Sequence, residues 1–256
     1  MNKRTKKIIL RIIVVFLSAL VGVACYTVYD IYKRPTKIPS VDKLIDDKKK
    51  EKYKEEEEKP VEEPYFNDLP GIRQVYGNED IVGKIEVPNL SINGLVVRAQ
   101  DNSYYLNYSI TKQYDLLGAT FFDYRNTDLN HDQQINIYGH NTNKPKIAER
   151  LPLINLEAYV DKGMFDNYKD IYLSIDERKM HYEVIAVKII TDQDNEHMKV
   201  KFRDEADFLT HASKLLRNTL YKRDNIEITG NSRLIVLQIC HYNPPETYLL
   251  VIGKEI

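Results

Sequence analysis

A cysteine and a histidine stand at the ends of two predicted strands, and together they could perform acyl transfer. Cys240 follows the mainly apolar run 233–239, which is typical of a buried strand. His140 follows a second such run, 135–138. A thiolate is a strong nucleophile and an imidazole can exchange protons with it. The pair therefore suits a reaction through a covalent acyl-enzyme, provided that the two strands are neighbours.

Other roles for these residues require more than the sequence offers. His241 directly follows Cys240, and adjacent strand residues point to opposite faces, so we do not expect His241 to share the site of Cys240. A zinc site built from Cys240, His140 and His241 would need a fourth ligand. The sequence shows no carboxylate cluster with convincing metal-binding spacing, so we predict no cofactor.

The N-terminal residues predict a membrane anchor. Four basic residues at positions 3–7 precede an apolar stretch, 8–29, that is interrupted only by Arg11. Such a stretch can span the hydrocarbon core as a helix, with its basic end in the cytoplasm. A cleaved signal peptide and a lipid anchor at Cys25 are alternatives. We predict an uncleaved signal-anchor helix within residues 1–32, which leaves the catalytic domain outside the cell membrane.

A charged stalk separates this anchor from a globular domain. Residues 33–64 combine runs of Lys and Glu with four prolines and almost no large apolar side chains, so they cannot bury a core. Residues 65–256 are numerous enough for one domain with an ordinary hydrophobic core. Cys240 is the only cysteine of this domain, so an internal disulfide is excluded. The net charge of −1 argues against a nucleic-acid-binding protein.

The pattern inside the domain predicts a mainly β fold. Runs rich in β-branched and aromatic residues, separated by turn residues, predict about eight strands, which is enough for a closed or nearly closed barrel. They are expected at 81–87, 94–97, 118–122, 135–138, 171–175, 181–190, 233–239 and 249–252. A short helix is expected at 69–77, with Pro70 near its start and Gly77 at its end.

One segment interrupts the β pattern just before the strand that ends at Cys240. Apolar residues from Phe208 to Leu220 recur with helical spacing, which predicts an amphipathic helix over 205–221. Asp204 is the expected N-cap of this helix. We expect its apolar stripe to pack onto the barrel rather than to form a groove for a partner.

Taken in order, these pieces resemble one known family, the class B sortases of Gram-positive cell surfaces. The resemblance covers roughly residues 70–256 and includes a helix inserted before the penultimate strand. Its motifs are Gly83-Lys84-Ile85, Tyr105-Leu106-Asn107, Phe122-Asp123-Tyr124-Arg125-Asn126, Tyr138-Gly139-His140-Asn141, Leu220-Tyr221-Lys222 and the strand ending in Cys240. No single motif is specific to this family, but the occurrence of all of them in this order is. The resemblance implies a closed eight-stranded sortase-type β-barrel with an N-terminal helix.

The resemblance also implies a membrane-anchored cysteine transpeptidase. Such an enzyme cleaves a C-terminal sorting signal of a secreted protein, in this class similar to Asn-Pro-x-Thr-Asn, and transfers the new carboxyl end to a cell-wall amine. Carried onto this chain, Cys240 would attack the threonine carbonyl and form a thioester. His140 would protonate the departing amine and deprotonate the incoming one. Asn107 and Tyr138 match positions near the substrate groove, although structural hydrogen bonding accounts for them nearly as well.

Two departures from the family pattern lie close to the chemistry. The family's Thr-Leu-x-Thr-Cys is Val-Leu-Gln-Ile-Cys at 236–240 here, so both threonines are absent. The family's arginine at the start of the last strand is replaced by Tyr248, and no arginine follows Arg233. Loss of a donor to the tetrahedral intermediate typically costs a factor of about 10² to 10³. Tyr248 could donate a neutral hydrogen bond instead, and Arg125 is a second candidate if the fold brings it near Cys240.

The sequence therefore leaves more than one function open. The first is an active sortase-type transpeptidase, and the second is a sortase-fold binding or scaffold module with weak or no catalysis. The third is a cysteine peptidase that releases acid by hydrolysis. Retention of both Cys240 and His140 favours activity. The expected partners are a sorting-signal peptide, the amine of a cell-wall precursor and the membrane, with no nucleic acid.

Overall fold

The computed structural model describes residues 68–148, 150–176 and 178–256. The predicted membrane anchor, the predicted stalk and the domain boundaries at residues 32 and 64 lie outside the described residues. Within the described ranges, no helix is both long enough and apolar enough to cross a lipid bilayer.

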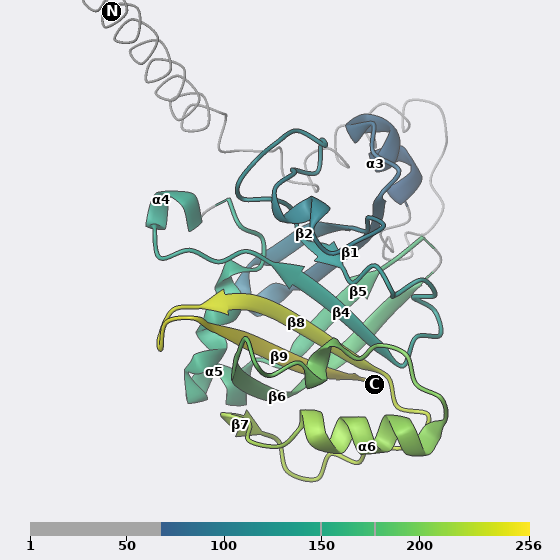
Figure 1. Ribbon diagram of the computed structural model, residues 1–256, viewed down its shortest axis with the longest axis vertical. Helices are drawn as coiled ribbons and strands as arrows, with labels where there is room; N and C mark the ends of the chain where they lie inside the picture. Colours follow the sequence, from purple (N-terminus) through teal and green to yellow (C-terminus); the bar gives the residue numbers. More distant parts are fainter. Residues whose placement is uncertain (1–67, 149, 177) are drawn as a thin grey trace, which may run out of the picture. The chain divides into compact units, whose positions relative to one another are not determined.

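The described chain is built from strands joined by short helices (Figure 1). The strands are β1 (Ile81–Val87), β2 (Ile92–Val97), β3 (Phe121–Phe122), β4 (Gln134–Gly139), β5 (Asp170–Ser174), β6 (Lys179–Thr191), β7 (Tyr221–Lys222), β8 (Leu234–His241) and β9 (Thr247–Glu255). The α-helices are α3 (Leu69–Tyr76), α4 (Pro145–Ala148), α5 (Lys162–Asn167) and α6 (Glu205–Leu215). The 3₁₀ helices are η1 (Pro88–Leu90), η2 (Tyr104–Leu106), η3 (Ile154–Val160) and η4 (Glu196–Met198).

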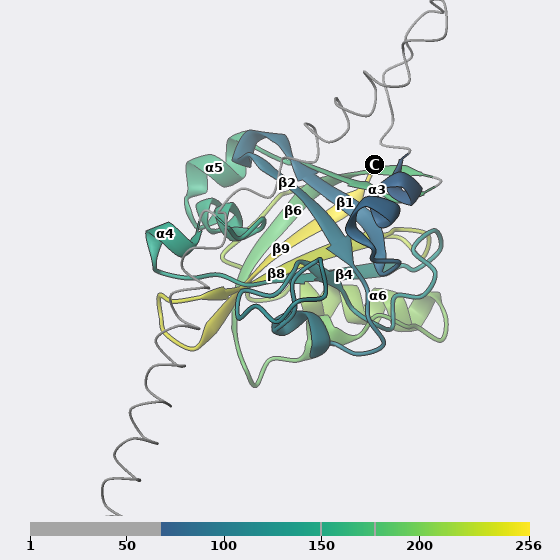
Figure 2. The same cartoon turned by 90° about the horizontal axis from the view of Figure 1, so that it is seen from above.

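Eight of the strands close a barrel. The strand order is β5-β1-β2-β3-β4-β8-β9-β6-β7, and β5 also pairs with β6, so the ring of pairings closes and β7 lies outside it. The predicted closed eight-stranded barrel is confirmed. Most neighbours are antiparallel, but β2 pairs with β3 and β4 pairs with β8 in parallel. Strands β4 and β8 lie side by side although they are far apart in the sequence (Figure 2).

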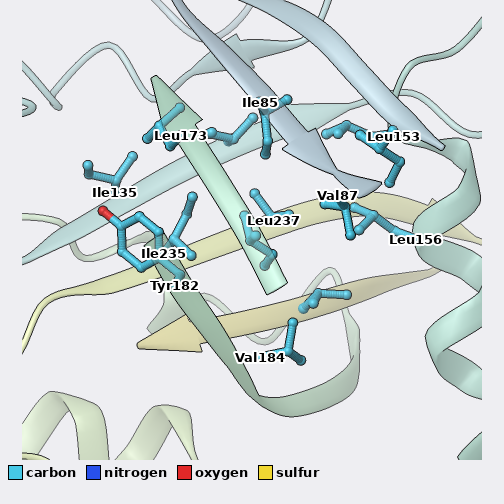
Figure 3. Packing of buried hydrophobic residues seen from close by; sticks show 14 of the residues in the cluster. Ile85, Val87, Ile135, Leu153, Leu156, Leu173, Tyr182, Val184, Ile235 and Leu237 are labelled. Carbon is cyan, nitrogen blue, oxygen red and sulfur yellow. The ribbon is translucent and has the colours of Figure 1, made fainter. Parts of the chain in front are cut away.

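An apolar cluster fills the interior of the barrel. Ile85, Leu173 and Tyr182 come from three different strands and meet there with Ile235 and Leu237 of β8 (Figure 3). Successive strand residues point to opposite faces, so the odd-numbered positions of β8 face this core. The even-numbered positions of β8 consequently face outward.

The predicted N-terminal helix is present as α3. Asp68 caps its start by accepting a hydrogen bond from the Gly71 backbone N–H at 3.0 Å. Pro70 lies in the first turn, where its missing N–H costs no intrahelical bond. Gly77 ends the helix with a left-handed φ of 59°, a conformation that favours glycine. The buried side of the helix packs against residues of β1, β2 and β3.

The inserted helix before β8 is shorter than predicted. It begins as expected, with Asp204 accepting a hydrogen bond from the Asp207 N–H at 2.8 Å, but it ends at Leu215. The chain takes a left-handed φ of 54° at Asn218, and Tyr221 belongs to β7 rather than to the helix. The prediction of an apolar face packed onto the barrel is confirmed, because α6 covers outward-facing residues of β6, β8 and β9 (Figure 1).

Candidate active site

Parallel pairing of β4 with β8 places the predicted cysteine and histidine side by side. The pairing ends with Gly139 opposite Ile239, so the next position along each strand brings His140 opposite Cys240. Neighbouring strands lie about 4.8 Å apart, and matched positions of parallel strands point to the same face. Both side chains are half-buried. The two strand ends therefore meet, as the acyl-transfer hypothesis requires.

A backbone carbonyl orients the ring of His140. The His140 Nε2 lies 2.8 Å from the carbonyl oxygen of Leu106 in η2. Because a carbonyl oxygen can only accept a hydrogen bond, this contact requires the proton on Nε2 and leaves Nδ1 free to take another. The sequence showed Leu106 within a family-like motif but gave no sign that its carbonyl orients the histidine.

The loop that supplies this carbonyl is held in place at several points. The buried Asp115 accepts a hydrogen bond from Arg150 Nη2 at 2.7 Å. Gly118 has a φ of 56°, and a Cβ at this position would collide with the carbonyl oxygen of Tyr105. The Tyr105 hydroxyl in turn donates to Asp80 at 2.7 Å. The acceptor for the His140 ring is therefore part of a fixed loop.

Asn107 and Tyr138, the two residues matched to the substrate groove, have different surroundings. Asn107 directly follows Leu106, and its side chain is exposed and hydrogen-bonded to no other described residue. It is available to a bound peptide. Tyr138 donates its hydroxyl to Asp123 Oδ2 at 2.8 Å. Burial and the Asp123 carboxylate raise the pKa of the Tyr138 phenol, so Tyr138 serves as a structural hydrogen-bond donor.

Arg125 does not take the place of the missing arginine. It donates to the two carboxylate oxygens of Asp123 at 2.8 and 2.7 Å and to the Met198 carbonyl at 2.7 Å. Burial would raise the pKa of the Asp123 carboxyl, but hydrogen bonds from Arg125, Tyr138 and Asn102 hold it below its ordinary value. Arg125 thus joins the segment after β3 to η4 and organises the barrel.

Tyr248 faces the cysteine from the opposite strand. Cys240 and Tyr248 are directly paired across β8 and β9, so their side chains emerge on the same face. The Tyr248 ring packs against the apolar cluster beneath α6. Its hydroxyl bonds to nothing else in the described part of the chain. Tyr248 therefore offers an unused neutral donor on the side of the sheet that carries the thiol.

Asn141, which follows His140, surrounds the cysteine with hydrogen bonds. Burial raises the pKa of the Cys240 thiol, and the backbone N–H groups of Asn141 and Cys240, which bond to the sulfur, oppose this only in part. The Asn141 side chain donates to the Cys240 carbonyl at 2.7 Å and to Glu157 at 3.2 Å. A raised pKa favours the protonated thiol over the thiolate at neutral pH. Sequence reasoning did not select Asn141, although its place beside His140 was a usable signal.

His241 lies on the opposite face from Cys240, as predicted. Its buried ring contacts Glu157 Oε1 through Nδ1 at 2.6 Å and the Asn243 carbonyl through Nε2. Glu157 belongs to η3, whose buried residues pack into the barrel core. Over residues 68–148, 150–176 and 178–256, no group of three His, Cys, Asp or Glu side chains is arranged to hold a metal ion.

Comparison with known proteins points to one family, although no family model matches the sequence. The sortase B of Listeria monocytogenes is 27% identical over 164 residues, which are 64% of this chain and 63% of that protein. The sortase B of Staphylococcus aureus is 25% identical over 195 residues, or 75% of each chain. The match to the Listeria protein thus spans less than two thirds of its length.

The fold agrees with the sequence similarity. The solved structure of Clostridium perfringens sortase B matches with a TM-score of 0.66 at 26% identity, over 73% of this chain and 98% of that one. The similarity therefore covers nearly the whole of that structure, including the closed barrel that carries Cys240 and His140. On both grounds, the chain is a homologue of the class B sortases.

Proposed function

We propose that this chain is a sortase-type cysteine transpeptidase that forms a thioester at Cys240. The observation that carries the proposal is the parallel pairing of β4 with β8 up to Gly139 and Ile239, the residues that directly precede His140 and Cys240. The Leu106 carbonyl fixes Nε2 of His140 as a donor, so Nδ1 is left to act as the base. A nucleophile beside a base that a third group orients is the arrangement that covalent acyl transfer requires.

In the first half-reaction, the cysteine becomes acylated. The thiol proton passes to His140 as the Cys240 sulfur attacks the scissile carbonyl carbon, and the carbonyl electrons move to oxygen. The imidazolium then protonates the departing amine as the C–N bond breaks, which leaves a thioester. Because burial raises the pKa of the thiol, the base must remove the proton during the attack. In the second half-reaction, His140 deprotonates an incoming amine, which attacks the thioester and releases Cys240.

Tyr248 is the group we assign to the developing oxyanion. It lies directly across from Cys240, and its hydroxyl bonds to no other described residue. A neutral hydroxyl is a weaker donor to an oxyanion than a guanidinium is, because charge-assisted hydrogen bonds are roughly twice as strong. We therefore expect a reaction slower than that of an enzyme with arginine at this position.

The substrates we propose are a C-terminal sorting signal similar to Asn-Pro-x-Thr-Asn and the amine of a cell-wall precursor. Solved structures with the same fold include a Staphylococcus aureus sortase B–substrate complex (TM-score 0.65, 23% identity) and a sortase B complexed with triglycine (TM-score 0.63, 22% identity). The exposed Asn107, next to the residue that orients His140, supports a peptide substrate at this edge of the barrel.

The place of action we propose is the outer face of the cell membrane. The support is the sequence of residues 1–32, in which a basic end precedes an apolar stretch. The charged segment 33–64 would then hold the catalytic domain away from the bilayer. Proteolysis of intact cells tests this: an anchored domain is digested from outside, whereas an internal one is protected until the cells are lysed.

One observation favours a second function, a binding or scaffold module without catalysis. The position of the family's arginine holds Tyr248, and Arg125 is committed to Asp123 and Met198. Neither of these two positions therefore supplies a cationic side chain for the oxyanion. A module of this kind would bind the sorting peptide without cleaving it.

Product analysis by liquid chromatography and mass spectrometry tests the proposal. The full chain, purified in detergent, is incubated with a panel of Asn-Pro-x-Thr-Asn peptides, with and without triglycine. A transpeptidase yields the peptide joined to triglycine, and Cys240→Ala abolishes that product. Cleavage to the free acid, unchanged by triglycine, would indicate a hydrolytic peptidase instead. Binding without cleavage would overturn the enzymatic proposal in favour of the binding module.

A further inference from the structure

A hydrogen-bonded group behind the cysteine has no part in the reaction described above. Its centre is Asn141, which is 8% exposed and uses every polar atom of its side chain and backbone. The Asn141 N–H bonds to the Cys240 sulfur, and its Nδ2 donates to the Cys240 carbonyl at 2.7 Å. Its Oδ1 accepts from the Thr142 N–H at 2.7 Å, and its carbonyl accepts from the Tyr242 hydroxyl at 2.8 Å. Asn141 therefore holds one residue, Cys240, by both its sulfur and its main chain.

The position of these bonds gives them a function in the sheet. The parallel pairing of β4 with β8 ends at Gly139 and Ile239, so it does not extend to the catalytic pair. The bond from Asn141 Nδ2 to the Cys240 carbonyl crosses between the same two strands one step further on. It acts as an additional rung, made by a side chain, that fixes Cys240 relative to the histidine strand.

Glu157 connects the residues that directly follow the two catalytic residues. Its Oε2 lies 3.2 Å from Asn141 Nδ2, and its Oε1 lies 2.6 Å from His241 Nδ1. Asn141 follows His140, and His241 follows Cys240. A single carboxylate in η3 thus contacts both strand ends just beyond the site. Loss of that carboxylate would release both contacts together.

The buried ring of His241 lies between two oxygen atoms. Its Nε2 faces the Asn243 carbonyl, and its Nδ1 lies 2.6 Å from Glu157 Oε1. The histidine side chain is 2% exposed and the glutamate side chain is 40% exposed.

We propose that Asn141 and Glu157, the latter through its contacts with Asn141 and His241, are positioning residues for Cys240. They set where the sulfur lies and how readily it ionises, and they do not touch the substrate. This role rests on the proposed function of Cys240 as the nucleophile. The reactivity of the thiol can nevertheless be measured without any sorting peptide, so the two proposals can fail separately.

The test is the pH profile of Cys240 alkylation by iodoacetamide in the full chain. Peptide mass spectrometry counts Cys240 separately from Cys25. Asn141→Ala removes the side-chain rung and loosens the N–H bond that favours the thiolate. We expect alkylation near pH 7 to slow by about 3- to 10-fold, the worth of one hydrogen bond, and the midpoint of the profile to move to higher pH.

Glu157→Gln is the second variant, chosen because it keeps the size of a partly exposed side chain and removes only its charge. We expect a slowing of about 2- to 5-fold and a shift in the same direction, with Glu157→Asp restoring part of the wild-type rate. Asp170→Asn is the matched control. It removes the carboxylate from another histidine contact, Asp170 to His181 at 2.7 Å, at the other end of β6 from the site. Its profile should equal that of the wild type.

The outcomes separate the two proposals. Glu157→Gln and Asn141→Ala profiles that coincide with the wild type, in folded protein as judged by thermal unfolding, would overturn the positioning role. Equal slowing in Asp170→Asn would overturn it as well, because the effect would then be general. Altered alkylation in a protein that transfers no peptide would overturn the proposed enzymatic function and leave the positioning role standing.

Discussion

The β4 side and the β9 side of Cys240 differ in the hydrogen bonds that their side chains make. On the β4 side, His140 is oriented by the Leu106 carbonyl, and Asn141 bonds to the cysteine through its side chain. On the β9 side, the Tyr248 hydroxyl bonds to no other described residue. The side that positions the nucleophile and moves its proton is complete, whereas the side that would stabilise the developing charge has one neutral donor. The difference predicts an enzyme with a well-placed nucleophile and weak stabilisation of its transition state.

Removal of the base, His140, should cause the largest loss of activity. His140→Ala removes the proton acceptor while Cys240 keeps its raised pKa, so we expect kcat/KM for peptide transfer to fall by about 10² to 10⁴. His131→Ala is the matched control, because that side chain is 82% exposed and pairs only with Asp128 among the described residues. A His140→Ala enzyme within a factor of about 3 of the wild type would contradict the assignment of the base.

Changes at Tyr248 should alter only the β9 side of Cys240, where the Tyr248 hydroxyl is the assigned donor to the oxyanion. Tyr248→Arg restores a charged donor, and we expect kcat/KM to rise by about 10- to 100-fold. Tyr248→Phe deletes the hydroxyl and should lower kcat/KM by about 10-fold, the worth of one neutral hydrogen bond. Tyr172→Arg adds the same charge on β5 as a control. If Tyr248→Phe and Tyr248→Arg both act like the wild type, the oxyanion donor lies elsewhere.

Asn107 should affect substrate binding more than chemistry. Its exposed side chain is free of bonds to the described residues, so a peptide can take up its amide. We expect Asn107→Ala to raise KM by about 3- to 10-fold with little change in kcat. Steady-state kinetics measure the split. A fall in kcat at constant KM would place Asn107 in the transition state instead.

The pH dependence of Cys240 alkylation tests whether the groups on the β4 side are sufficient to ionise the thiol. We expect that they are not. Burial raises the pKa of the thiol, so less thiolate is present at neutral pH than in a free cysteine, whose pKa is about 8.5. Alkylation of Cys240 should therefore be slow at pH 7 and should increase up to a midpoint above that of free cysteine. A midpoint below that of free cysteine would show a resting thiolate and would change the order of proton transfer.

Most of the barrel could be predicted from the sequence, because strands with one buried face carry a regular alternation. The errors lie where that signal ends. The strand predicted at 118–122 is confined to Phe121–Phe122, because Gly118 takes a left-handed φ of 56°. The helix predicted to Tyr221 ends at Leu215, because apolar spacing continued past the point where Asn218 turns the backbone.

The site was predictable only in part, for a different physical reason. Cys240 and His140 could be selected because each stands at the end of a recognisable strand, and Tyr248 because it replaces an expected arginine. The contacts of Glu157 with Asn141 and His241 depend on how η3 packs beside two strands that are distant in sequence. A single sequence holds no periodic signal for such contacts. The same limit applies to the carbonyl of Leu106, since backbone atoms carry no residue type.

The most direct test of the central claim is to trap the acyl-enzyme in the first turnover. The full chain is mixed with an Asn-Pro-Gln-Thr-Asn peptide in the absence of amine, quenched in acid and analysed by intact-protein and peptide mass spectrometry. We predict an adduct with the mass of the Asn-Pro-Gln-Thr acyl group on Cys240, absent from Cys240→Ala and discharged by triglycine. Peptide that binds without any adduct on Cys240, across a panel of related signals, would contradict the claim.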